Sequence, residues 1–163
     1  MGACTFRAVA ELGFSFRLDG DFSEIVVPSP AQPVIDTALW RHTCFEAFVC
    51  VDGETSYYEF NFAPSGAWAI YAFHGYRDGG PLHDRSMQPQ IAVRATAARL
   101  ELDALVQLER IPELRGASRL RVALSAVLET RGGFSYWALE HPVDRPDFHN
   151  PGGFSLLIEV PES

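Results

Sequence analysis

The sequence predicts an all-β protein, folded as an antiparallel β-sandwich of the immunoglobulin-like or jelly-roll kind. Aromatic residues make up 12% of the chain and occur with abundant valine, glycine and proline, a composition that favours strands and turns. Short apolar runs between frequent turn signals predict about ten strands. The sequence shows no convincing helical stripe and no internal repeat of about 20–50 residues. We expect one domain, spanning residues 1–163.

The first expected strand lies near the N-terminus. Residues 14–18 alternate apolar and polar side chains and end at an Asp-Gly turn at 19–20, a pattern typical of a half-buried strand. The apolar run at 24–27 is followed by a proline-rich segment at 28–33. Because proline cannot donate a ladder hydrogen bond, we expect a short edge strand there that leads into a loop.

A three-stranded meander is expected in the middle of the chain. Residues 43–51 and 56–64 have the composition of strands, and they flank DGET, a four-residue hairpin loop that contains Asp-Gly. After the turn PSG, residues 67–76 form the third strand.

The second half of the chain alternates strands with longer loops. Residues 75–90 are predicted to be a loop from their composition, and 141–153 a long loop rich in proline and glycine. For residues 100–114, a short helix is an alternative to a strand. The strands expected in this half are 91–98, 99–108, 120–129, 134–140 and 154–160.

Charge and cysteine content narrow the function classes. A formal net charge of -8 repels phosphate backbones, which argues against nucleic-acid binding. No segment approaches the ~20 apolar residues of a membrane span, and the N-terminus lacks a signal-peptide pattern. Cys4, Cys44 and Cys50 have no metal-ligand spacing, and their odd number suits a reducing compartment. We therefore expect a cytoplasmic protein that binds neither nucleic acid nor membranes.

The central hairpin separates two chemically different faces. Strand side chains alternate, so pairing Val51 with Ser56 makes one face wholly apolar and aromatic. That core face comprises Phe45, Ala47, Val49, Tyr58, Phe60 and Phe62. The opposite face comprises Glu46, Phe48, Cys50, Tyr57, Glu59 and Asn61. Cross-strand neighbours lie about 5 Å apart and diagonal ones about 7–8 Å, so two carboxyls and an amide should form one polar cluster.

The register of the third meander strand stays open. A three-residue loop at 64–66 places Tyr71 and Phe73 on the polar-aromatic face, whereas a four-residue loop gives Trp68 a different register. The sequence alone does not choose between the two.

A face of carboxyl, amide and aromatic groups has the chemistry of a sugar site. Glu and Asn can match the donors and acceptors of sugar hydroxyls, and aromatic rings pack on the sugar's C–H face. The competing interpretation is an ordinary outer sheet face that is solvated, covered by a loop, or used in a homodimer. Two nearby carboxylates repel each other, so burying them unpaired is costly, and this favours the functional interpretation.

The blocks LWRHTCFEAFV, YYEFNFAPSGAWAIYAF and YWALEHPVDRPDFH resemble a DOMON-like domain, the superfamily that includes family-nine carbohydrate-binding modules. The resemblance covers residues 14–160 and is closest to a bacterial stand-alone subgroup grouped by name with UDP-N-acetylmuramate dehydrogenase. It implies a β-sandwich that binds sugar or haem, with aromatic side chains clamping a terminal saccharide. The positions that match these blocks are Trp40, Glu46, Glu59, Asn61, Trp68 and Trp137.

The segment HPVDRPDFH brings several polar side chains close together in sequence. Asp147 and His149 could form part of a metal site or an acid–base pair, or they could fix the loop by hydrogen bonds to its own backbone. The spacing matches no standard metal motif. Haem-binding relatives use a Met and a His, and Met87 matches no such motif position.

These observations together predict a non-catalytic domain that binds a carbohydrate or a sugar-containing metabolite, without cofactor or metal. The alternatives are a metal-dependent or acid–base enzyme centred on Asp147 and His149, and a haem-binding domain. The predicted ligand-binding residues are Trp40, Glu46, Tyr57, Glu59, Asn61, Trp68, Tyr71, Trp137 and His149.

Overall fold

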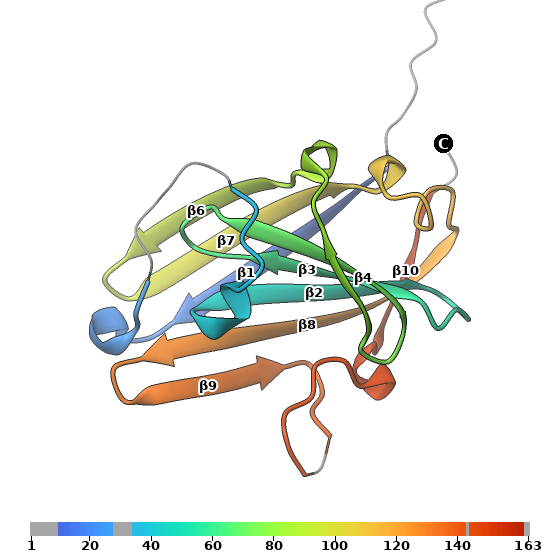
Figure 1. Ribbon diagram of the computed structural model, residues 1–163. Coiled ribbons are helices and arrows are strands. Elements are labelled where there is room, and N and C mark those ends of the chain that lie inside the picture. The colour runs from blue at the N-terminus through green and yellow to red at the C-terminus, as the bar shows by residue number, and fades with distance from the viewer. Residues whose placement is uncertain (1–9, 28–33, 143, 162–163) are drawn as a thin grey trace, which may run out of the picture.

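The protein is an antiparallel β-sandwich. The computed structural model describes residues 10–27, 34–142 and 144–161, and this part of the chain contains ten strands (Figure 1). The strands are β1 (Glu11–Asp19), β2 (Cys44–Val51), β3 (Tyr57–Phe62), β4 (Trp68–Gly75), β5 (Asp78–Leu82), β6 (Gln90–Thr96), β7 (Arg99–Gln107), β8 (Arg119–Thr130), β9 (Gly133–Ala138) and β10 (Leu156–Glu159). Short 3-10 helices connect them: η1 (Phe22–Glu24), η2 (Leu39–Arg41), η3 (Arg85–Met87), η4 (Leu108–Arg110) and η5 (Pro151–Gly153).

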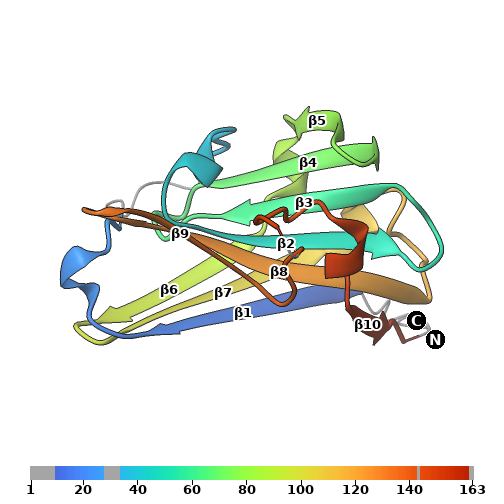
Figure 2. The same ribbon diagram turned by 90° about the horizontal axis from the view of Figure 1, so that it is seen from below.

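The strands form a smaller and a larger sheet. The smaller sheet has the order β1-β7-β6, and the larger has the order β10-β8-β2-β3-β4-β5, with β9 also paired to β8. Figure 2 shows the smaller sheet lying across one face of the larger one. β9 lies in the larger sheet beside β8, and the other face of this sheet carries the connections that contain η2 and η5.

The core fills the space between the two sheets. Alternate residues of β7, from Leu100 to Val106, are buried against the apolar face of the central hairpin. Phe14 of β1 packs its ring 5.9 Å from that of Phe62. Burying one such side chain contributes about 1.5–3 kcal/mol, so this face fixes which side of each strand points inward.

The predicted hairpin register is confirmed. Phe45 pairs with Phe62, Glu46 with Asn61, and Phe48 with Glu59, as expected from pairing across the DGET loop. The core face predicted from alternation is the one that joins the core cluster.

The short loop at 64–66 settles the register left open for the third strand of the meander. Tyr71 of β4 lies opposite Glu59, and Phe73 lies opposite Tyr57. Both rings therefore share the polar-aromatic face, and Trp68 turns toward the core.

Two expectations for the second half of the chain are corrected. Residues 75–90 are not all loop, because β5 pairs with β4 inside this segment. A side chain at Gly79 would place its Cβ 1.9 Å from the carbonyl oxygen of Ala72, so glycine permits this close pairing. The helix alternative for 100–114 is also wrong: β7 continues to Gln107 and is followed only by the short η4.

The expected edge strand at 24–27 is reduced to a single bridge between Ile25 and Thr130. The proline-rich segment 28–33 and Cys4 lie outside the described residues. Cys44 and Cys50 are both buried and carry free thiols. Within the described ranges, none of the helices has the length and apolar character needed to cross a bilayer.

Candidate functional site

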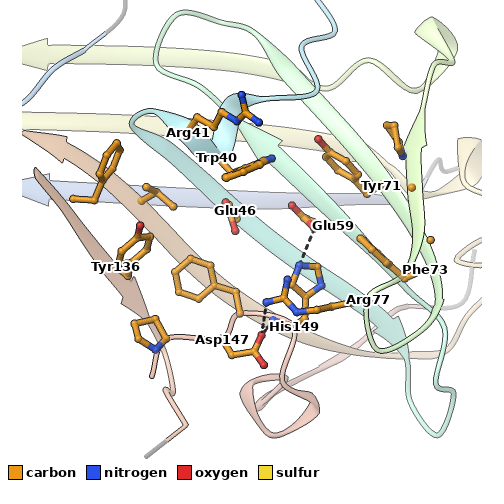
Figure 3. Close-up of a pocket in the computed structure, with 17 residues that line it drawn as sticks. Trp40, Arg41, Glu46, Glu59, Tyr71, Phe73, Arg77, Tyr136, Asp147 and His149 are labelled. Carbon is orange, nitrogen blue, oxygen red and sulfur yellow. Dashed lines mark hydrogen bonds and ion pairs between the residues drawn. The ribbon is translucent and has the colours of Figure 1, made fainter. Parts of the chain in front are cut away.

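A cavity of about 830 Å³ opens on the outer face of the larger sheet, away from the sandwich core (Figure 3). Its floor comes from β2, β3 and β8, and its walls come from η2, β4, the β4–β5 turn, β5, β9 and the loop before η5. The lining residues are Trp40, Arg41, Glu46, Glu59, Tyr71, Phe73, Arg77, Gly79, Gly80, Pro81, Val127, Phe134, Tyr136, Pro146, Asp147, Phe148 and His149.

Two carboxyl groups lie on the cavity floor. Glu46 is 3% exposed and accepts a hydrogen bond from Ser125 Oγ at 3.3 Å. Glu59 is 6% exposed and accepts from Asn61 Nδ2 at 2.8 Å. Figure 3 shows both carboxyls among the aromatic side chains of the walls.

Burial changes the protonation of both groups. Burial, and then the charge of the neighbouring Glu59, raises the pKa of Glu46 to about 8. Burial also raises the pKa of Glu59 to about 7, although the hydrogen bond from Asn61 and the charge of Arg77 oppose the rise. The two carboxyls therefore hold protons close to neutral pH.

His149 closes one side of the floor. Burial, and then the charge of Arg77, lowers the pKa of His149 to about 4, so its ring is neutral near pH 7. Its Nδ1 lies 2.8 Å from Tyr57 Oη, and its Nε2 lies 3.5 Å from Glu59 Oε2. Because Tyr57 Oη already accepts the backbone N–H of Arg77, its own proton is free to go to Nδ1. The His149 tautomer with its hydrogen on Nε2 accepts the Tyr57 proton at Nδ1 and points an N–H toward Glu59.

An ion pair anchors the loop that carries His149. Arg77 Nη2 lies 2.7 Å from Asp147 Oδ1, and Tyr76 Oη donates to Asp147 Oδ2 at 2.6 Å. Asp147 Oδ1 also accepts the backbone N–H of His149. Burial tends to raise the pKa of Asp147, but the hydrogen bonds from Tyr76 and Arg77 outweigh it and the pKa is lowered.

The Asp147 and His149 side chains do not bond to each other. Each is held by other groups, and the use of Asp147 to fix the loop backbone agrees with one of the alternatives weighed from the sequence. In the part of the chain that the structure describes, no three His, Cys, Asp or Glu side chains are grouped so as to hold a metal ion.

Five of the nine predicted site residues line this one cavity: Trp40, Glu46, Glu59, Tyr71 and His149. Tyr57 and Asn61 lie behind the lining, where they bond to His149 and Glu59. Asn61 is fully buried, and its Oδ1 atom has no hydrogen-bond partner among the residues that the structure describes.

The remaining two tryptophans lie elsewhere, which corrects their inclusion in the site. Trp68 is 1% exposed in the sandwich core, because the β3–β4 turn places it opposite Phe62 on the inner face. Trp137 is 61% exposed. It pairs with Ala126, one residue out of phase with the cavity-lining pair of Val127 and Tyr136, so it faces away from the cavity.

Sequence reasoning did not predict several wall residues as ligand-binding: Arg41, Phe73, Arg77, Phe134, Tyr136 and Phe148. Phe134 and Tyr136 could have been found, because their spacing of two puts them on one face of a strand. Arg77 gave no such signal. It lies in the tight turn between β4 and β5 with a φ of 56°, which is uncommon for a non-glycine residue.

The fold and site together define the class: an antiparallel β-sandwich with a polar-floored, aromatic-walled cavity on the outer face of its larger sheet. The chain is similar in structure to a "putative carbohydrate-binding protein" from Bacteroides uniformis, seen in a crystal structure. The TM-score is 0.65 at 19% sequence identity, and the match covers 89% of this chain and 71% of that one. This likeness shows a shared fold. A scan against protein-family models and a search of curated proteins found no match.

Proposed function

We propose that this protein is a non-catalytic ligand-binding domain whose cavity takes a carbohydrate or a sugar-containing metabolite. The observation that carries the proposal is the pair of buried carboxyls, Glu46 and Glu59, on the floor of an aromatic-walled cavity. A volume of about 830 Å³ lies in the range of small-molecule sites, which run from about 300 to 1,000 Å³.

The floor and the walls offer complementary contacts to a sugar. A protonated carboxyl both donates and accepts hydrogen bonds, as a sugar hydroxyl does, and the raised pKa values of Glu46 and Glu59 give them this property near neutral pH. The rings of Trp40, Tyr71 and Tyr136 supply flat apolar surfaces on which a C–H face can pack.

One comparison supports the proposal without deciding the ligand. The structural neighbour from Bacteroides uniformis is described as a "putative carbohydrate-binding protein". We further propose that the chain is a member of the DOMON-like superfamily, which its three sequence blocks resemble. We also propose a cytoplasmic location and a homodimer that forms through the aromatic outer face.

The enzyme alternative centred on Asp147 and His149 has less support. Both carboxylate oxygens of Asp147 are engaged by Arg77 and Tyr76, so this group is held as a structural anion and is not free to act as a base. Its lowered pKa also makes it a weak base.

A binding screen with matched tryptophan variants tests the proposal. Mono- and disaccharides should raise the melting temperature of the protein in a thermal-shift assay and give heat on calorimetric titration. Trp40→Ala should remove binding without unfolding, because Trp40 lines the cavity and is already 50% exposed. Trp137→Ala is the control, since this exposed ring lies on the other face. A well-folded protein that responds to none of the sugars would rule the proposal out.

A further inference from the structure

The cavity floor has more hydrogen-bond acceptors than donors. With both carboxyls ionised, the acceptors are the four carboxylate oxygens of Glu46 and Glu59 and the unpartnered Oδ1 of Asn61. The neighbouring donors are Ser125 Oγ, Asn61 Nδ2 and the Nε2–H of the neutral His149. Buried acceptors without donors are costly, so protons bind to the carboxyls in compensation.

The floor also lacks a matching positive charge. No arginine in the described ranges forms an ion pair with Glu46 or Glu59. Arg77 is engaged by Asp147, and Arg41 lies with its Cζ 5.1 Å from the centre of the Trp40 ring. The sequence contains no lysine, so no side chain of this protein carries an ammonium group.

The walls around the floor are suited to a cation. Trp40, Tyr71, Phe73 and Tyr136 all line the cavity, and Figure 3 shows them around the two carboxyls. The negative face of an aromatic ring attracts an ammonium group, with a larger effect where water is excluded. Aromatic walls over buried carboxyls therefore favour a ligand that is cationic at one end.

We propose that the ligand is an amino sugar with a free, protonated amine, and that its ammonium group lies between Glu46 and Glu59. This inference rests on the proposed carbohydrate-binding function and narrows its substrate class. An ammonium group supplies three N–H donors and one positive charge. It thus provides both the hydrogen-bond donors and the charge that the floor lacks, in place of the bound protons.

The exchange of protons for an ammonium makes binding depend on pH. Without a bound ligand, Glu46 and Glu59 are protonated below about pH 7–8. A bound cation stabilises their charged forms, so binding releases protons and affinity rises with pH through this range while the amine stays protonated. Other titratable or charged side chains also face the two carboxyls. Those on the sheet are Cys44 on β2, Tyr57 on β3, Tyr71 on β4 and Tyr136 on β9. Those on the connections are Arg41 on η2, Arg77 in the β4–β5 turn, and Asp147 and His149 in the loop before η5.

Two matched pairs of probes separate the amine from the sugar ring. The first pair is a hexosamine and its parent hexose, in gluco, galacto and manno configurations, with the N-acetylated hexosamine as a neutral analogue. The second pair is cyclohexylamine and cyclohexanol. They share a six-membered carbon ring and differ in charge, and neither carries the set of hydroxyls of a sugar. Calorimetric titration at pH 7.5 should show each amine binding about tenfold or more tightly than its neutral partner.

Variants and buffers then test the assigned position. Glu46→Gln and Glu59→Gln should each bring the amine-to-neutral affinity ratio close to one, whereas Glu54→Gln, an exposed change in the β2–β3 loop, should leave it unchanged. Titration in two buffers of different ionisation heat should show release of about one proton on amine binding. Two glutamine variants guard against one of them failing to fold.

The outcomes distinguish this inference from the proposed function. Equal binding of hexose and hexosamine overturns the amine assignment and leaves carbohydrate binding standing. Binding of cyclohexylamine with no response to any sugar supports the ammonium site and overturns the carbohydrate proposal. Tight amine binding that survives both glutamine variants overturns the assigned position, and no binding by any probe overturns both proposals.

Discussion

Replacing Glu46 with glutamine should make the protein more stable at alkaline pH and should reduce the pH dependence of its stability. In the folded protein, burial raises the pKa of Glu46 from 4.5 to about 8. The native state therefore holds this proton more tightly than the unfolded chain does. As the pH rises from about 4.5 to about 8, the unfolded state is increasingly favoured and stability is lost. Glutamine has nearly the same shape and carries no titrating group.

The size of the effect follows from the two pKa values. One pKa unit corresponds to about 1.4 kcal/mol, so the Glu46 contribution should fall by about 3–4 kcal/mol between pH 5 and pH 8. His149 acts in the opposite direction, because its lowered pKa makes stability fall as the pH drops from about 6.5 toward 4. The comparison between wild type and Glu46→Gln largely cancels this contribution.

Urea unfolding followed by tryptophan fluorescence measures the effect. The free energy of unfolding of Glu46→Gln minus that of wild type should become more positive by about 3 kcal/mol from pH 5 to pH 8. Glu54→Gln, in the exposed β2–β3 loop, should give a difference that stays constant with pH. Parallel curves for wild type and Glu46→Gln would refute the reasoning, since they would mean that burial does not perturb this carboxyl.

Three further predictions concern packing and the cavity wall. Trp68→Ala should lower the free energy of unfolding by about 3–5 kcal/mol in urea, because it empties part of the core; a loss under about 1 kcal/mol would contradict its burial. Gly79→Ala should lower the melting temperature, because its Cβ would meet the backbone of β4, whereas Gly80→Ala has open space and should have little effect; similar melting temperatures would count against the close strand pairing. Asp147→Asn should speed proteolysis and amide exchange in the loop at 144–150, because it weakens the bond to Arg77; unchanged rates would show that the ion pair does not hold the loop.

Much of the fold could be predicted because its signals are local. A hairpin with a four-residue loop has its register set within about 18 residues, and alternation then assigns each side chain to a face. This reasoning placed Glu46, Glu59 and Asn61 together and on the correct face. It failed for β5, because a strand of sequence DGGPL has the composition of a loop and exists only through its pairing with β4.

The cavity could be predicted only in part. Its floor comes from neighbouring strands, but its walls come from segments at 40–41, 71–81, 134–136 and 146–149, which are distant in sequence. Trp68 shows the limit most clearly, because one residue of turn length decides whether this ring faces the ligand side or the core. No local pattern encoded that choice.

The sequence by itself determined the all-β class, the pairing of the central hairpin and the grouping of two carboxyls with an amide beside aromatic rings. Only the tertiary structure decided that this group is buried beneath a cavity, and that Arg77 is paired with Asp147 and forms no ion pair with the carboxyls. The reason is physical. Alternation is a property of each strand, whereas burial and the protonation that follows from it depend on the other segments that cover the face.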